Sequence, residues 1–261
     1  MITAGIDMGT QSVKVVILKD NEILSQELAF SGFEPTKTAK QAFEEALKKA
    51  RITRNDIEHI TATGASVDLA PYSDTTISMV GADARAGTYY FPLARTVIDI
   101  GAEEARAVRC DEKGAMVNFV INERCAAGAG TFIEAMARAL EVELEEMGPL
   151  SLKAEKASPI NATCVIFGES DVVTLIHRQE SKPEIARAIY DAMANRISSM
   201  VHRLGMNPNV VLIGGVANDI GFVSSFKRTL GTDLLIPKDP EFAGALGAAL
   251  NAIKRIGEFK E

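Results

Sequence analysis

Two short segments of the sequence combine an aspartate, a glycine and further polar side chains in the order Asp-x-Gly: Asp7–Ser12 and Asp99–Glu104. Glycine in a turn lets backbone N–H groups approach an anion closely, and the hydroxyls of Thr10 and Ser12 add donors. A carboxylate is repelled by a phosphate unless a Mg²⁺ ion lies between them, because this hard cation binds both kinds of oxygen. One Asp-x-Gly alone is usually an ordinary turn, whereas two of them favour a magnesium–phosphate site.

The two Asp-x-Gly segments belong to a pattern that occurs twice, at an offset of 92 residues from Asp7 to Asp99. In each copy, a strand ends at the Asp-x-Gly, a second strand follows, and a turn leads to a third strand. The expected strands are 4–6, 13–18 and 23–30 in the first copy, and 96–100, 105–110 and 116–121 in the second. This duplication predicts two similar α/β lobes with a cleft between them. No low-complexity linker occurs in the sequence, so we expect the lobes to be joined by short hinges.

The rest of the chain alternates between apolar runs of strand type and segments with helical periodicity. A third candidate binding element is Gly214-Gly215-Val216, which follows the apolar run 209–213; two glycines there would let a ring or a sugar approach the backbone closely. The other expected strands are 57–63 and 234–236, and the expected helices are 39–50, 130–140, 169–178, 184–203, 220–230 and 241–256.

Along the chain, the first hairpin, the second hairpin and the glycine pair follow one another. In this order they resemble the nucleotide-binding motifs of the superfamily that contains actin, the sugar kinases and the large heat-shock chaperones. The resemblance implies a duplicated, two-lobed, actin-like (ribonuclease H-like) α/β fold that clamps ATP and Mg²⁺. It assigns residues 1–95 to the first lobe, joined by the C-terminal helix 241–261, and residues 96–240 to the second. The implied catalytic residues are Asp7, Asp99, Glu103 and Glu104. The implied nucleotide-binding residues are Gly9, Thr10, Gln11, Ser12, Lys14, Gly101, Ala102, Gly214, Gly215 and Val216.

Two of the three cysteines, Cys125 and Cys164, directly precede expected helices, whereas Cys110 lies within an expected strand. A thiol at a helix N-terminus faces the positive end of the helix dipole, which favours the thiolate. An iron–sulfur cubane takes four thiolates, so two cysteines from each chain of a symmetric dimer would supply a complete set. Buried cysteines without a role are the alternative. The three histidines are isolated from one another and from the cysteines, which argues against zinc.

The sequence around these two cysteines narrows the resemblance to one family. Asn-Glu-Arg-Cys-Ala-Ala-Gly-Ala-Gly-Thr-Phe-Ile-Glu at 122–134 and Thr-Cys-Val-Ile-Phe-Gly-Glu-Ser at 163–170 are similar to the two signatures of the activator ATPases of 2-hydroxyacyl-CoA dehydratases. The ATPase subunits of benzoyl-CoA reductase belong to the same family. The resemblance implies that Cys125 and Cys164 bind one 4Fe–4S cluster shared between two subunits. Gly101–Glu104 differs from the Gly-Gly-Gln-Asp of many dehydratase activators, which leaves the water-positioning residue and the acceptor open.

The resemblance implies an ATP-hydrolysing electron-transfer protein of anaerobic metabolism. It would work as a dimer of two copies, or of one copy with a close paralogue. Ferredoxin or flavodoxin would donate an electron, which the chain would pass at low potential to an acyl-CoA dehydratase or reductase. Two alternatives remain open at this point: a small-molecule kinase of the same superfamily with bystander cysteines, and a nucleotide-regulated scaffold related to actin. The chain offers no recognisable substrate domain for a kinase.

The composition is that of a globular protein, with 47% hydrophobic and 24% charged residues. The formal net charge is −7 and no run of Lys and Arg occurs, which argues against a nucleic-acid partner. The sequence contains neither an apolar stretch of membrane-span length nor a basic, apolar leader at its start. We therefore expect a cytoplasmic protein that has no membrane partner.

Overall fold

A computed structural model of the chain describes residues 1–122, 129–161 and 164–258. The chain divides into two compact units. Unit 1 comprises Met1–Ala94, Cys110–Val117 and Phe242–Glu261, and unit 2 comprises Arg95–Arg109 and Asn118–Glu241. No helix in the described part of the chain is long and apolar enough to cross a membrane.

Unit 1 is built on a five-stranded sheet in the order β3-β2-β1-β4-β5. Strands β1, β2 and β3 form two successive antiparallel hairpins, and β4 and β5 extend the sheet in parallel. The turn between β2 and β3 contains Asp20 and Asn21, which both have positive φ, as a tight hairpin turn requires. The strand bounds are Ile2–Met8 (β1), Ser12–Lys19 (β2), Glu22–Phe30 (β3), His59–Thr63 (β4) and Thr75–Thr76 (β5).

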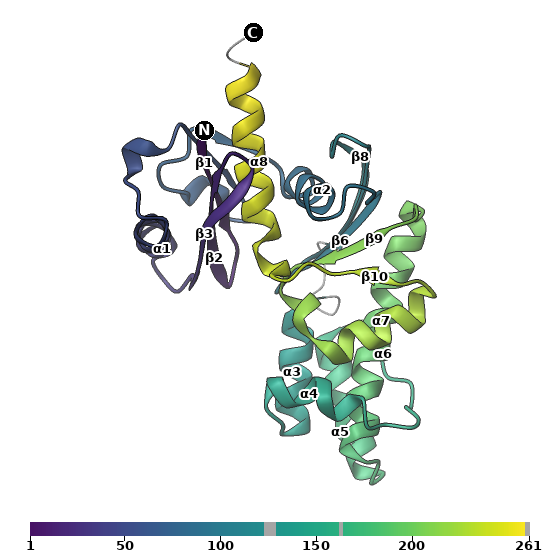
Figure 1. Cartoon of the computed structure of the whole chain (residues 1–261). Helices are drawn as coiled ribbons and strands as arrows, with labels where there is room; N and C mark the ends of the chain where they lie inside the picture. The colour runs from purple at the N-terminus through teal and green to yellow at the C-terminus, as the bar shows by residue number, and fades with distance from the viewer. Residues whose placement is uncertain (123–128, 162–163, 259–261) are drawn as a thin grey trace. The chain divides into compact units, whose positions relative to one another are not determined.

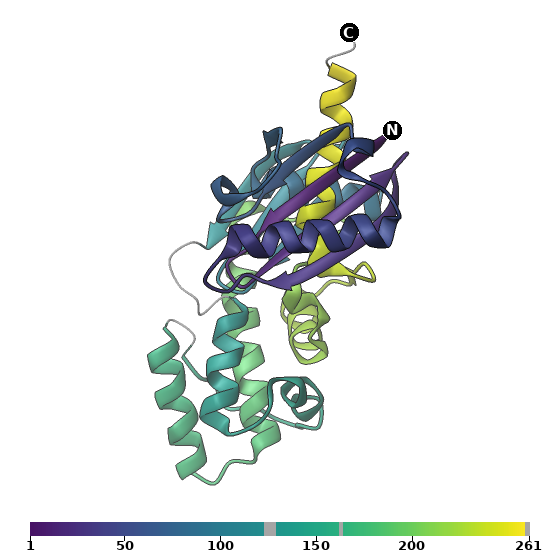
Figure 2. The same cartoon turned by 90° about the vertical axis from the view of Figure 1, so that its left-hand side faces the viewer.

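Helices α1 (Pro35–Ala50) and α8 (Ala243–Glu258) lie on opposite faces of this sheet (Figures 1 and 2). Gly5 of β1 allows α8 to pack closely, because a Cβ atom there would overlap the backbone of Ala245 and Ala249. A further helix, α2 (Met79–Tyr90), packs against α8, where Gly247 leaves room for the backbone of Ala82. The C-terminal helix therefore completes the core of unit 1.

A second five-stranded sheet, in the order β10-β9-β6-β7-β8, belongs to unit 2 except for Cys110 at the end of β7 and residues 116–117 at the start of β8, which fall in unit 1. Its central strand pairs with an antiparallel neighbour on one side and a parallel neighbour on the other, as β1 does in unit 1. The strand bounds are Thr96–Ile100 (β6), Ala105–Cys110 (β7), Met116–Asn122 (β8), Val210–Ile213 (β9) and Leu234–Leu235 (β10). The repeat in the sequence thus corresponds to a repeat in sheet topology, which confirms the predicted duplicated α/β fold.

Unit 2 also carries a group of five helices: α3 (Gly130–Leu140), α4 (Leu144–Ser151), α5 (Val165–His177), α6 (Lys182–Leu204) and α7 (Ile220–Leu230). The bounds of α3 and α7 are as predicted. Helix α6 begins two residues earlier than predicted, at a capping box formed by Ser181 and Glu184. Helix α5 begins at Val165 rather than at the predicted residue 169. The apolar residues after Cys164 form its first turn.

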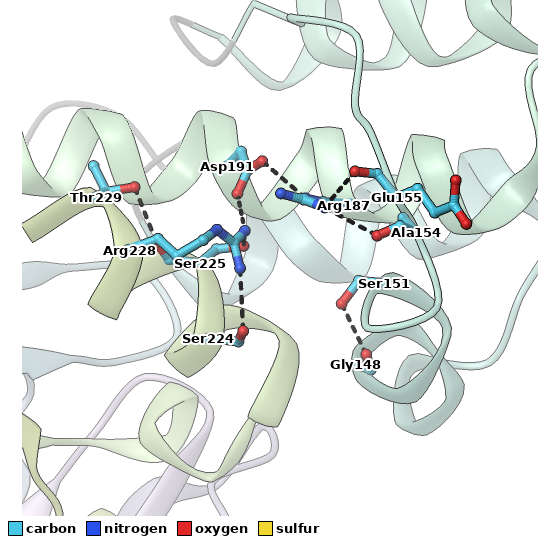
Figure 3. Close-up of polar contacts among 10 residues, drawn as sticks. All are labelled: Gly148, Ser151, Ala154, Glu155, Arg187, Asp191, Ser224, Ser225, Arg228 and Thr229. Atoms are coloured by element: carbon cyan, nitrogen blue, oxygen red, sulfur yellow. Dashed lines mark hydrogen bonds and ion pairs between the residues drawn. The ribbon is translucent and has the colours of Figure 1, made fainter. Parts of the chain in front are cut away.

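Polar contacts join α6 to α7 and to the segment that follows α4 (Figure 3). Asp191 of α6 forms ion pairs with Arg187, one turn earlier on the same helix (3.5 Å), and with Arg228 of α7 (2.6 Å). The Arg187 guanidinium also donates to the carbonyl oxygens of Ala154 and Glu155, which follow α4. Asp191 and Arg187 therefore connect α6 with α7 and with the segment after α4, at the surface of a shared apolar core.

Candidate nucleotide site and cluster cysteine

The first Asp-x-Gly lies at the end of β1, where the hairpin to β2 begins. Asp7 is the register partner of Lys14, and the Lys14 Nζ atom lies 3.7 Å from Asp7 Oδ2. A Cβ atom on Gly9 would approach the Ser12 carbonyl oxygen to 2.7 Å, so glycine permits the close turn there. Thr10 and Gln11 at the tip of the turn are exposed.

Two glycines from other elements enclose the Asp7 carboxylate. Gly64, directly after β4, has φ +104, and a Cβ atom on it would lie 2.6 Å from Asp7 Oδ1. Gly244, in the first turn of α8, would place a Cβ atom 3.0 Å from Asp7 Oδ2. The carboxylate therefore lies against backbone on two sides, with Lys14 as its basic neighbour.

The second Asp-x-Gly has the same framework but a stronger ion pair. Asp99 of β6 is the register partner of Arg106, whose guanidinium binds the carboxylates of both Asp99 and Glu104. The Arg106 Nη1–Glu104 Oε1 distance is 2.6 Å, and Arg106 and Asp99 are both buried. The Gly101 N–H closes the turn by donating to the Glu104 carbonyl oxygen at 2.9 Å. Glu103 is exposed.

The glycine pair follows β9 in unit 2, the parallel neighbour of β6. Gly214 has φ +88, and a Cβ atom there would overlap Asp99 Oδ1 and the carbonyl of Ile100. Gly215 is exposed with no heavy atom within 4 Å of its Cβ position, and Val216 is buried. Gly214 therefore packs against the second aspartate, whereas Gly215 leaves open space beside the backbone.

Sequence analysis did not identify Arg106 or Gly64 as site residues. The 92-residue offset contains the signal for Arg106, because it maps Lys14 onto Arg106. Gly64 follows β4 as Gly214 follows β9, and both glycines have positive φ and pack on an aspartate. These equivalences depend on the strand register. The offset indicates the first equivalence in the sequence, whereas the equivalence of Gly64 and Gly214 becomes visible only when the sheets have formed.

The structure places Cys164 at the N-cap of α5, in an extended conformation and partly exposed. The Asn161 N–H donates to Oδ2 of Asp171, which belongs to α5, at 2.7 Å. Cys110 is buried in unit 1, and its thiol donates to the Ala94 carbonyl oxygen at 3.6 Å, as expected of a structural cysteine. Cys125 lies outside the described residues. Within the described part of the chain, no three potential ligands group into a metal site.

Backbone hydrogen bonds link the second hairpin to α3, the helix that follows the Cys125 segment. The N–H groups of Gly130 and Thr131 donate to the carbonyl oxygens of Gly101 and Ala102, both at 2.9 Å. A Cβ atom on Gly130 would lie 3.3 Å from Val216 Cγ2, so this helix start also meets the segment after the glycine pair.

Helix α3 in turn packs against α5, whose N-cap is Cys164. Gly168 of α5 lies against the Phe132 ring and the Met136 sulfur of α3, where a Cβ atom would approach them to 3.0 and 3.2 Å. Within unit 2, α3 therefore contacts the second hairpin at its N-terminus and α5 along its side.

Comparison with known proteins identifies the same family as the sequence motifs did, over nearly the whole chain. Residues 4–252 match the BadF/BadG/BcrA/BcrD ATPase family. The chain is 37% identical to the activator of lactoyl-CoA dehydratase from Anaerotignum propionicum, over 97% of both chains. It is 33% identical to one of the subunits of benzoyl-CoA reductase from Thauera aromatica, over 95% of this chain and 92% of the relative.

A solved structure agrees with these relatives. The activator of the 2-hydroxyisocaproyl-CoA dehydratase from Clostridium difficile, with bound ADPNP, superposes with a TM-score of 0.92 at 35% identity, over 100% of this chain and 97% of that one. Sequence and structure therefore show that this chain belongs to the BadF/BadG/BcrA/BcrD ATPase family.

Proposed function

We propose that this ATPase is an electron-transfer activator. It delivers low-potential electrons to a partner enzyme of the 2-hydroxyacyl-CoA dehydratase or benzoyl-CoA reductase type. The observation that carries the proposal is the connection inside unit 2, from a phosphate hairpin through α3 to the N-cap cysteine of α5. The names of the relatives support an acceptor of this type, and the ADPNP-bound activator supports nucleotide binding.

At the nucleotide end, the chain contributes two hairpins and a glycine pair. In our proposal the hairpins bind the phosphates and Gly214-Gly215 lies beside the adenosine, where the open space next to Gly215 fits a flat group. The carboxylate of Asp7 suits Mg²⁺, because this hard cation prefers carboxylate oxygens as ligands. When bound, Mg²⁺ would supply charge neutralisation for the phosphates.

Arg106 gives the second hairpin a different charge balance. Its guanidinium neutralises Asp99 and Glu104 together, so this hairpin presents less negative charge to a nucleotide phosphate than two free carboxylates would. The two glutamates of this hairpin have different environments, since Glu104 forms an ion pair with Arg106 and Glu103 is exposed. We assign the positioning of the attacking water to this pair as a proposal.

At the other end, Cys164 together with Cys125 would bind the cluster. The N-cap position suits a thiolate ligand, since the helix dipole favours negative charge there. A 4Fe–4S cluster supplies storage of one electron, and two chains would contribute its four thiolates. The chain therefore functions as a dimer in this proposal. A ferredoxin or flavodoxin would load the electron, and the acyl-CoA chemistry would occur in the acceptor.

The iron content of cysteine variants tests the cluster assignment. We expect Cys125→Ser and Cys164→Ser, purified without oxygen, each to lose the cluster and its brown colour. The matched control, Cys110→Ser, removes a buried thiol that donates to the Ala94 carbonyl oxygen, and it should retain the cluster. Full iron and sulfide content in either of the first two variants would show that the ligand assignment is wrong.

A further inference from the structure

One buried hydroxyl beside the first aspartate has no hydrogen-bond partner among the described residues. Thr63, the last residue of β4, is 1% exposed, and its Oγ1 atom is neither solvated nor bonded. Most buried polar groups in native proteins are paired, because leaving one unpaired costs free energy. A ligand that arrives at this position is one explanation for such an atom.

The strand register places Thr63 next to Asp7. The two residues are register partners in the parallel pair β1–β4, so their side chains lie on the same face of the sheet. Helix α8 covers this face: the Thr3 hydroxyl donates to the Ala249 carbonyl oxygen at 3.1 Å, and Gly244 adjoins the Asp7 carboxylate. The Thr63 hydroxyl therefore lies at the end of the sheet where Asp7, Gly64 and the start of α8 meet.

The duplicated unit shows that the fold itself does not require this hydroxyl. In unit 2, the register partner of Asp99 is Ile213, a fully buried apolar side chain at the position equivalent to Thr63. The Thr63 hydroxyl also differs in its hydrogen bonding from the hydroxyl of Thr61, two residues earlier on β4. Thr61 is equally buried, but its Oγ1 atom lies 3.0 Å from Thr75 Oγ1. At the position that pairs with the aspartate, a hydroxyl without a hydrogen-bond partner therefore occurs in unit 1 and not in unit 2.

We propose that Thr63 is a positioning residue for the magnesium–nucleotide complex, and this inference rests on the proposed ATP-dependent function. Its hydroxyl would accept a hydrogen bond from a water bound to the Mg²⁺ ion that Asp7 attracts. Mg²⁺ usually retains several of its waters in proteins, and such waters are strong donors. A direct phosphate contact is disfavoured at this position, because the adjacent carboxylate would repel the phosphate oxygens.

Calorimetric binding of ADP to the intact chain, with Mg²⁺ and with EDTA instead, tests this inference. We expect Thr63→Val to weaken Mg²⁺–ADP binding by about three- to tenfold, the range of one hydrogen bond, and to leave Mg²⁺-free ADP binding unchanged. Thr63→Ser should retain the wild-type affinity to within about twofold. Because valine removes an unpaired buried hydroxyl, the melting temperature of the nucleotide-free variant should stay equal or rise.

Thr61→Val is the matched control, since it removes a paired hydroxyl from the same strand. It should lower the melting temperature and leave Mg²⁺–ADP affinity unchanged. Equal Mg²⁺–ADP affinity in Thr63→Val and wild type would overturn the inference, and so would a loss of equal size with and without Mg²⁺. A wild-type protein that binds no Mg²⁺–ADP would instead overturn the proposed function.

Discussion

The two glycines of the Gly214-Gly215 pair should respond very differently to alanine. Gly214 has φ +88 and ψ +169, a region that essentially only glycine adopts and that costs another residue about 1–3 kcal/mol. A Cβ atom there would also overlap Asp99 Oδ1 and the carbonyl of Ile100, and such overpacking costs about 1–3 kcal/mol. Gly214→Ala should therefore lower the free energy of unfolding by about 2–6 kcal/mol, a large part of the roughly 5–15 kcal/mol of a typical domain.

Urea denaturation followed by circular dichroism measures this effect, and two other glycines separate its causes. Gly231 lies in open space and in the left-handed α region, with φ +66 and ψ +26, so Gly231→Ala should show only the smaller backbone cost of that region, about 1–2 kcal/mol. Gly215→Ala should change stability by less than about 0.5 kcal/mol, because its Cβ position has no heavy atom within 4 Å. In our proposal Gly215→Ala nevertheless weakens ATP binding, since the methyl group occupies space beside the nucleotide. Equal stability of Gly214→Ala and Gly231→Ala would refute the close contact between Gly214 and Asp99.

Two further predictions concern the aspartates. Asp7→Ala and Asp99→Ala should each reduce the rate of ATP hydrolysis at least about 100-fold, because electrostatic stabilisation of a transition state is typically worth that much. Both variants should retain the brown colour of the proposed cluster. Full turnover with Mg²⁺–ATP in either variant would contradict the assignment of these aspartates to the nucleotide site. Burial raises the pKa of Asp219, which also accepts a hydrogen bond from the Tyr190 hydroxyl at 2.5 Å. A raised pKa means that the folded state binds the Asp219 proton more tightly than the unfolded state does. The free energy of unfolding of wild type, relative to that of Asp219→Asn, should therefore be greatest below the ordinary carboxyl pKa of about 3.9. It should decrease as the pH rises through the raised pKa. Urea denaturation of both proteins between about pH 4 and pH 8 would reveal a difference of the opposite sign if Asp219 were favoured as the anion.

Local signals in the sequence were sufficient for the hairpins, most of the helices and the duplicated fold. The Asp-x-Gly turns, the paired strands and the apolar stripe of α3 are patterns of a few neighbouring residues, and the structure confirms them as secondary structure. The resemblance to the family of activator ATPases is confirmed by the match over residues 4–252.

Two helices were absent from the sequence prediction for identifiable reasons. Helix α2 buries mainly alanine and glycine, including Ala82, Ala84 and Gly87, so it lacks the stripe of large apolar side chains on which helical periodicity depends. Helix α4 contains Pro149, a residue that normally indicates a helix boundary. Tertiary packing, rather than local propensity, determines both.

The contacts around the aspartates depend on strand register, which the sequence does not show directly. The pairing of Asp99 with Arg106 requires β6 and β7 to be antiparallel in one register, and the place of Thr63 requires β4 beside β1 in parallel. Parallel neighbours come from distant parts of the chain, so their side-chain pairs become apparent only in the folded sheet.

The central claim is that nucleotide binding changes the surroundings of the cluster although the two are held by different residues. The direct measurement compares the EPR spectrum of the reduced cluster, and the rate at which an iron chelator removes iron, in the nucleotide-free, ADP-bound and ATP-analogue-bound protein. A ligand shifts a conformational equilibrium only by its differential affinity for the two states, and the coupling is reciprocal. The account predicts a changed spectrum and a changed chelation rate with the ATP analogue. Identical spectra and identical rates in all three states would contradict it.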